Sequence, residues 1–164
     1  MTVDALKPPA YIPGGPYPRP GESPRQAQDS PGLAEGWKES AAYLVGFELF
    51  NAGYYWEAHE IWEMLWNHEG RTGPIADLLR GLIKLAAAGV KVRQNQKHGV
   101  VTHGTRAAVC FDAARAVKGS PILGMDLVRL SQIAASIANG PPTTVTSLED
   151  PLVRVFEFTL WPTV

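Results

Sequence analysis

The sequence predicts an all-α protein: a single-domain five-helix bundle, with a proline-rich extended N-terminal arm before it and an extended apolar C-terminal tail after it. Three observations support this prediction. Apolar residues between positions 33 and 140 recur at intervals of three and four, the period of a helix buried on one face. Glycine and proline divide this periodic region into five segments. The 164 residues, 45% apolar and 19% charged, have the size and balance of one globular domain.

The predicted arm covers residues 1–32 and holds eight of the fourteen prolines. Proline removes a backbone donor and fixes φ, so this segment cannot form a helix or a central strand. Tyr11, Ile12 and Tyr17 lie among the prolines, and a fully solvated linker seldom keeps such side chains. We therefore expect an extended arm that lies on the domain in preference to a disordered one.

The helices of the bundle, predicted over residues 33–140, follow in order. The first ends at "NAG", where Gly53 can adopt the left-handed conformation, and the second begins almost at once, which makes the pair an antiparallel hairpin. Pro74 suits the first position of the third helix, and the small residues Ala86–Gly89 allow a neighbouring helix to approach closely. Glycine and proline close the last two helices. The five predicted helices span roughly residues 33–52, 54–70, 74–94, 100–118 and 125–138.

The tail, residues 141–164, is predicted to be extended and to pack on the bundle. Its alternating sets are Val155, Glu157 and Thr159 on one side and Phe156, Phe158 and Leu160 on the other. The second set would give the tail one apolar edge.

Several functional classes are disfavoured by composition. Fifteen basic against sixteen acidic residues give a net charge of -1, which argues against a nucleic-acid-binding face. The N-terminus has no apolar run of signal-peptide length, and "GLIKLAAAGVKV" is too short and too charged to span a bilayer. We expect a soluble, cytoplasmic protein. Cys110 is the single cysteine, and its apolar context predicts a buried hydrophobic residue and not a nucleophile.

The segment "YYWEAHEIWEMLW" in the second predicted helix concentrates aromatic and titratable side chains. On a helical wheel, a narrow stripe is formed by Tyr55, His59, Trp62 and Trp66. Ala58 and Leu65 flank it on one side; Trp56 and Glu63 flank it on the other, with Glu60 further round and Glu57 opposite. The wheel therefore predicts that His59 lies inside a buried aromatic stripe, with Glu63 one turn away.

Three interpretations of this segment remain open. His59 and Glu63 can form a structural hydrogen-bond network, in a protein that dimerises or docks a partner through an exposed Trp56 or Trp62. Alternatively, they line an inter-helix pocket for a small ligand or a reaction of unknown type. In that pocket, the catalytic candidates are His59, Glu60, Glu63 and Lys84, and the ligand-pocket candidates are Tyr55, Trp56, Trp62, Trp66 and Arg80. Lys84 or Arg80 would be an anion clamp, or a counter-charge to Glu60 or Glu63.

The third interpretation is a metal-dependent, hydrolase-like site. "HEIWE" resembles the HExxH helix of zinc proteases, except that Glu63 stands in place of the second histidine. The candidate metal ligands are His59, Glu63 and, from the fourth predicted helix, His103. The sequence thus leaves a divalent metal cofactor open and requires none.

The phrases "LFNAGYYWEAHEIWEMLW", "GPIADLLRGLIKLAAAGVKV" and "GVVTHGTRAA" resemble the bacterial and archaeal domain-of-unknown-function family 309 over about residues 43–118. The matching positions are Phe50, Asn51, Gly53, Tyr54, Tyr55, Trp56, Glu57, Ala58, His59, Glu60, Glu63, Trp66, Gly81, Leu82, Ile83 and Lys84. The resemblance implies an all-helical fold and assigns no activity. A family phrase that keeps a histidine, two glutamates and aromatic residues together also implies a shared polar pocket.

Overall fold

The computed structural model describes residues 9–19, 32–143 and 146–164, and within these ranges it is all-helical, without strands. The all-α prediction is confirmed, but the described chain contains six α-helices where five were predicted. The elements are α1 (Leu33–Gly36), the 3-10 helix η2 (Trp37–Glu39), α2 (Ala41–Ala52), α3 (Tyr55–His68), α4 (Pro74–Arg93), α5 (Lys97–Lys118) and α6 (Leu127–Asn139).

The additional helix arises because the first predicted helix breaks at Ser40. Ser40 has extended backbone angles, and its Oγ accepts a hydrogen bond from the Tyr43 N–H at 3.2 Å, so that it caps α2. At the other end of α2, Gly53 has φ of 101°, as predicted for a left-handed cap. The start of α5 also differs from its prediction, since Lys97 to Gly99 belong to the helix and not to the preceding turn.

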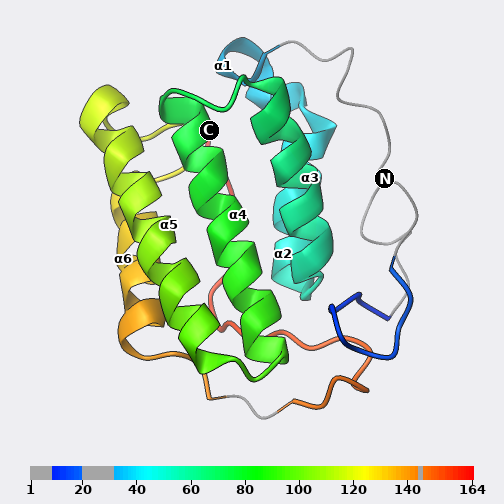
Figure 1. The fold of residues 1–164 in the computed structure, drawn as a ribbon. Coiled ribbons are helices and arrows are strands. Elements are labelled where there is room, and N and C mark those ends of the chain that lie inside the picture. The colour runs from blue at the N-terminus through cyan, green and yellow to red at the C-terminus, as the bar shows by residue number, and fades with distance from the viewer. Residues whose placement is uncertain (1–8, 20–31, 144–145) are drawn as a thin grey trace.

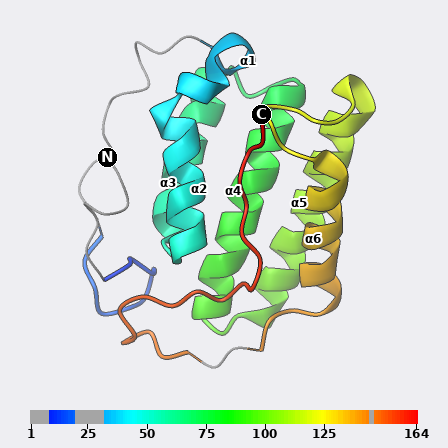
Figure 2. The same cartoon turned by 180° about the vertical axis from the view of Figure 1, so that it is seen from behind.

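The helices pack in chain order: α2 on α3, α3 on α4, α4 on α5 and α5 on α6. Figure 1 shows α3, α4 and α5 side by side, with α2 and α6 behind them. Seen from behind, the C-terminal tail runs along α4 between α2 and α6 (Figure 2). None of the described helices combines the length and the apolar composition that crossing a bilayer demands.

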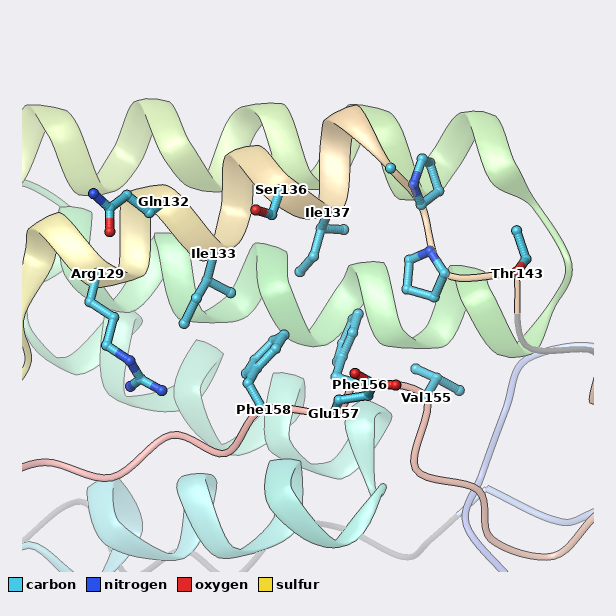
Figure 3. Close-up of a pocket in the computed structure, with 13 residues that line it drawn as sticks. Arg129, Gln132, Ile133, Ser136, Ile137, Thr143, Val155, Phe156, Glu157 and Phe158 are labelled. Carbon is cyan, nitrogen blue, oxygen red and sulfur yellow. The ribbon is translucent and has the colours of Figure 1, made fainter.

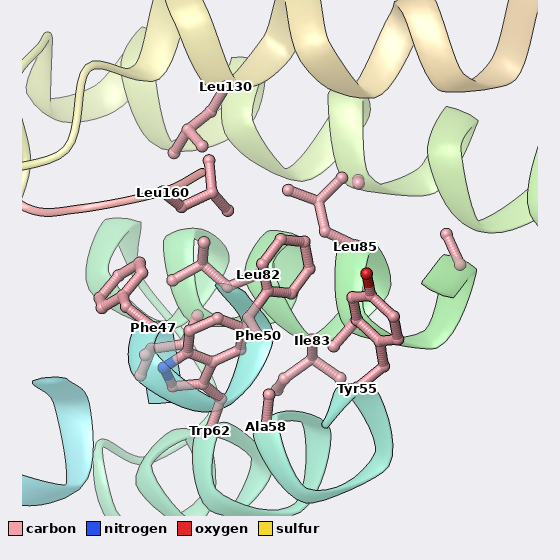
Figure 4. Close-up of a cluster of buried hydrophobic side chains, with 14 of the residues drawn as sticks. Phe47, Phe50, Tyr55, Ala58, Trp62, Leu82, Ile83, Leu85, Leu130 and Leu160 are labelled. Atoms are coloured by element: carbon pink, nitrogen blue, oxygen red, sulfur yellow. The ribbon is translucent and has the colours of Figure 1, made fainter. Parts of the chain in front are cut away.

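The core is built from aromatic rings of α2, α3 and the tail, together with aliphatic side chains of α4 and α6 (Figure 4). Close approach depends on two glycines. A Cβ at Gly46 would lie 2.0 Å from Trp62 Nε1, and one at Gly89 would lie 2.5 Å from the ring of Tyr55. The small-residue segment of α4 therefore admits α3, as predicted.

The tail is extended, but its burial does not follow the predicted alternation. Phe156 and Leu160 are buried, and Val155, from the other set, is buried as well. Val155 is drawn inward because its N–H donates to the Tyr55 hydroxyl at 2.9 Å. Phe158, predicted on the apolar edge, is only half-buried.

The described part of the N-terminal arm, residues 9–19, lies on one end of the bundle (Figure 1). Ala10 and Ile12 are buried. The Ala10 N–H donates to the Pro151 carbonyl at 2.7 Å, and Gln94 Nε2 donates to the Pro13 carbonyl at 2.8 Å. This part of the arm therefore joins α4 and the tail, whereas the rest of the predicted arm falls outside the described residues.

Candidate functional site

The buried face of α3 differs from the face that the wheel predicted. Ala58, Trp62 and Leu65 are buried, whereas His59 and Trp66 are half-buried. The prediction that His59 lies inside the buried stripe is therefore wrong, and His59 lies at its edge. The physical reason is that α3 packs on both α2 and α4, which moves the centre of the buried face toward Ala58.

His59 lies between two carboxylates at this edge. Its Nδ1 is 3.5 Å from Glu60 Oε1, and its Nε2 is 3.8 Å from Glu63 Oε2. The three side chains are 22%, 29% and 47% exposed in the order His59, Glu60 and Glu63, so solvent reaches the group. One potential ligand atom from each residue lies within 4.8 Å of the others. We call these three residues the His–Glu–Glu cluster.

The arm covers one side of this cluster. Arg19 NH2 lies 3.5 Å from Glu60 Oε2, and the Arg19 guanidinium lies over the Trp56 ring at 5.5 Å. The ring of Tyr11 meets Trp56 edge-on at 5.1 Å, and Trp56 in turn lies 5.2 Å from the His59 ring. The half-buried Trp56 side chain therefore lies between the arm and the cluster and contacts both.

Glu57 was placed on the solvent side by the wheel, and the structure corrects this. Its Oε1 accepts a hydrogen bond from the Tyr11 N–H at 3.0 Å, while its Oε2 is buried without a hydrogen-bond partner. Burial raises the pKa of Glu57, and the nearby charge of Glu60 acts in the same direction. The wheel missed this residue because the arm that covers it lies 46 positions earlier in the chain.

His103 on α5 is not part of the three-residue group that the structure brings within ligand distance. It is half-buried, and its Nδ1 lacks a hydrogen-bond partner. The pKa of His103 is lowered to about 4, chiefly by burial and to a smaller extent by the positive charges of Lys84, Lys91 and Arg106 and by His59. His103 is therefore neutral at neutral pH.

Arg80 and Lys84, the two predicted cations of α4, differ in their partners. Arg80 pairs with Asp77 at 3.6 Å and lies over the Trp66 ring at 5.8 Å, so its counter-charge is Asp77. Lys84 is half-buried and has no ion pair among the described residues. Trp66 also contacts Arg71, and its Nε1 is buried without a partner.

Tyr55 and Trp62, predicted to line a ligand pocket, lie in the hydrophobic core (Figure 4). The Tyr55 hydroxyl accepts a hydrogen bond from the Val155 N–H, and Trp62 Nε1 donates to the Tyr43 carbonyl at 3.4 Å. Neither polar group points at the cluster. Cys110 is buried, and burial raises the pKa of its thiol, in agreement with its predicted structural role.

The chain matches a known protein family over part of its length. Residues 43–103 match the family model described as Domain of unknown function (DUF309). No curated protein matches the chain. The matched residues run from α2 into α5 and include the whole His–Glu–Glu cluster and His103. The resemblance predicted from the sequence is thus confirmed over residues 43–103, which match the DUF309 family model.

Proposed function

We propose that the His–Glu–Glu cluster binds a divalent metal ion. The observation that carries this proposal is the convergence of three ligating side chains from α3, whose ligand atoms lie within 4.8 Å of one another. One imidazole and two carboxylates suit zinc and other divalent first-row metals. Three protein ligands at a solvent-accessible edge leave coordination positions free, as in metal sites that bind a further molecule.

The hydrogen bonding of His59 supports a ligand more than a closed structural network. Its Nδ1 is buried and has no hydrogen-bond partner. A buried polar atom left in this state costs about 1–3 kcal/mol, so a network built for stability would be expected to pair it. A metal bound to Nδ1 would give this atom a partner, with the carboxylates of Glu60 and Glu63 as neighbours.

The surroundings favour a small anionic molecule as the second ligand. Lys84 is half-buried on α4 without an ion-pair partner among the described residues, and its charge acts on His103. Neutral His103 can accept or donate one hydrogen bond at each ring nitrogen, according to its tautomer. We infer that an anion bound to the metal would be held by Lys84, with His103 as a polar neighbour. This assigns a ligand class and no reaction.

The alternative of a homodimer or partner-docking module is less well supported. It needs Trp56 or Trp62 as an exposed aromatic surface. Trp62 is buried in the core, and Trp56 is packed against Tyr11 and Arg19 of the same chain.

Titration of metal-free protein with zinc or manganese chloride in a calorimeter tests the proposal. We expect one bound ion per chain, and we expect His59→Ala and Glu63→Gln each to weaken binding by at least about tenfold because each removes a ligand. His98→Ala is the matched control, since His98 is an exposed histidine at the start of α5. Less than about one-tenth of an equivalent bound at saturating metal, or equal losses in H59A and H98A, would refute a metal function.

A further inference from the structure

A cavity lies between α6 and the C-terminal tail, and it shares no residue with the His–Glu–Glu cluster (Figure 3). Its volume is about 680 Å³. This lies within the range of roughly 300–1,000 Å³ that is typical of small-molecule pockets. Helix α6 forms one wall, and residues 155–158 of the tail form the other.

The two walls present apolar side chains to each other. Figure 3 shows Ile133 and Ile137 of α6 pointing toward the rings of Phe156 and Phe158. The two rings stack at 5.1 Å, and Phe156 stacks in turn on the core residue Phe50 at 5.7 Å. Ile133 and Phe158 are only half-buried, so part of this apolar surface is left in the cavity. The core thus holds one wall rigidly, ready to receive an apolar body.

Arg129, an exposed residue of α6, supplies a positive charge beside Phe158, at one end of this apolar region (Figure 3). One of its NH2 hydrogens is donated to the Thr159 carbonyl at 3.2 Å, which ties the guanidinium to the tail. Among the described residues, no carboxylate lies within ion-pair distance of Arg129. Its remaining donors have the fork geometry that matches a carboxylate.

Glu157 carries the one negative charge of the described lining. In Figure 3 it lies beside Val155, away from Arg129. It is exposed. A negative ligand group would be repelled at the Glu157 end and attracted at the Arg129 end. The two charges therefore give the cavity a polarity along the tail.

From this arrangement we propose that the cavity binds a small amphipathic carboxylate. The carboxylate is held by Arg129, and the apolar body lies between Ile133 and Ile137 on one side and Phe156 and Phe158 on the other. Gln132 and Ser136, both exposed on α6, line the same cavity and offer hydrogen bonds to a polar substituent. The site is independent of the metal proposal, because it shares no side chain with it.

Three probes of equal length test the charge assignment: 4-phenylbutanoate, 4-phenyl-1-butanol and 4-phenylbutylamine. Titration into the full chain, followed by the NMR signals of the Ile133 and Ile137 methyl groups, locates the binding. We expect the carboxylate to bind tightest and the amine weakest. Arg129→Gln should lower the affinity for the carboxylate by at least about tenfold and leave the affinity for the alcohol unchanged. Arg154→Gln, an exposed arginine of the same tail outside the cavity, should change neither affinity.

A blocking variant separates the cavity from a general charge effect. Ser136 is exposed and lines the cavity, so Ser136→Trp should fill it and abolish binding of both the carboxylate and the alcohol. If R129Q does not fold, Arg129→Lys replaces it. R129K keeps the positive charge, so it should weaken binding of the carboxylate less than removal of the charge would. The proposal is refuted if the Ile133 and Ile137 methyl signals do not move at about 5 mM carboxylate, because a dissociation constant above this concentration is too weak for specific binding. It is also refuted by equal losses in R129Q and R154Q, or by an amine that binds tighter than the carboxylate.

Discussion

Four polar atoms near the exposed side of α3 lack hydrogen-bond partners: Glu57 Oε2, His59 Nδ1, Trp66 Nε1 and, on α5, His103 Nδ1. Buried groups in this state are uncommon in folded proteins, because each gives up its bonds to water without replacement. Four of the eight such atoms among the described residues lie on α3 and on α5, where each costs local stability. Such a sacrifice is expected where side chains are kept free for a ligand.

Glu57 gives a pH-dependent test at this scale. Burial raises its pKa above the ordinary value of 4.5, so the folded state holds the proton more tightly than the unfolded chain. The free energy of unfolding therefore falls as pH rises from the ordinary toward the raised pKa, and the loss persists above it. Glu57→Gln removes this loss, and we expect the variant to be more stable than the wild type at neutral pH.

Thermal unfolding of both proteins between about pH 4 and pH 8 measures this effect. The difference should shrink toward the acid end, as Glu57 becomes protonated in both states. Glu157→Gln, at an exposed glutamate of the tail, is the control and should follow the wild type. Parallel wild-type and E57Q profiles across the whole range would contradict the assignment.

At this scale the sequence could select His59, Glu60 and Glu63, because Glu63 follows His59 by four residues and Glu60 by three, and both spacings make neighbours on a helix. It could not select Glu57, because its partner is the backbone N–H of Tyr11, and a backbone group leaves no residue-type signal. The exposure of His59 was also missed, since a wheel shows the angle of a side chain but not which neighbours cover it.

At the scale of elements, the hairpin of α2 and α3 is held by contact between a ring and a backbone. Trp62 of α3 lies directly against Gly46 of α2, and its ring meets Phe47 at 5.1 Å and Phe50 at 6.1 Å. Any side chain at position 46 would force the two helices apart. The packing of Trp62 between α2 and α3 therefore requires a glycine at position 46.

Gly46→Ala should destabilise the protein by about 1–3 kcal/mol or more, because a methyl group overpacks the contact with Trp62. The matched control is Gly99→Ala on α5. There a Cβ would meet the side chain of Lys91 at 2.8 Å, and that chain is flexible enough to move. G99A should be neutral or slightly stabilising, since alanine favours a helix over glycine by about 1 kcal/mol. Denaturant unfolding of both variants measures this, and equal midpoints would disprove the role of Gly46.

The positions of α3 and α4, and the left-handed cap at Gly53, followed from periodicity, Pro74 and the glycine itself. The break before α2 was missed although a signal exists: serine is a favoured N-cap, and Ser40 immediately precedes the helix. Periodic apolar residues on both sides of Ser40 masked it, because η2 continues nearly the same turn.

At the scale of the whole molecule, the tail takes the place of a further helix behind α4 (Figure 2). Asn51 of α2 holds it with two hydrogen bonds, one to the Leu160 carbonyl and one from the Leu160 N–H, both at 2.9 Å. Leu160 is itself completely buried, and Phe156 stacks on Phe50. The sequence could predict an extended apolar tail, but not Asn51 as its anchor, because nothing local links two residues 109 positions apart.

Leu160→Ala should cost about 2–5 kcal/mol, as expected for a large-to-small change in a packed core. Trp161→Ala is the control at the adjacent position, where the side chain is about half exposed and should contribute little. The free energies of unfolding in denaturant give both values. If L160A and W161A had similar stabilities, the tail would be a surface strap and not a part of the core.

The hydrogen bonds between Asn51 and Leu160 imply an order of folding during synthesis, because they join residues 109 positions apart. Helices α2 to α5 emerge from the ribosome before the tail that runs along α4 (Figure 2). Until Phe156 and Phe158 have emerged, the ring of Phe50 lacks the two rings that stack on it and is available to other nascent chains or to chaperones. Closing a contact across 109 residues is also slow compared with forming local helices, so the nascent bundle should pass through a period of chaperone dependence that ends only when the tail docks.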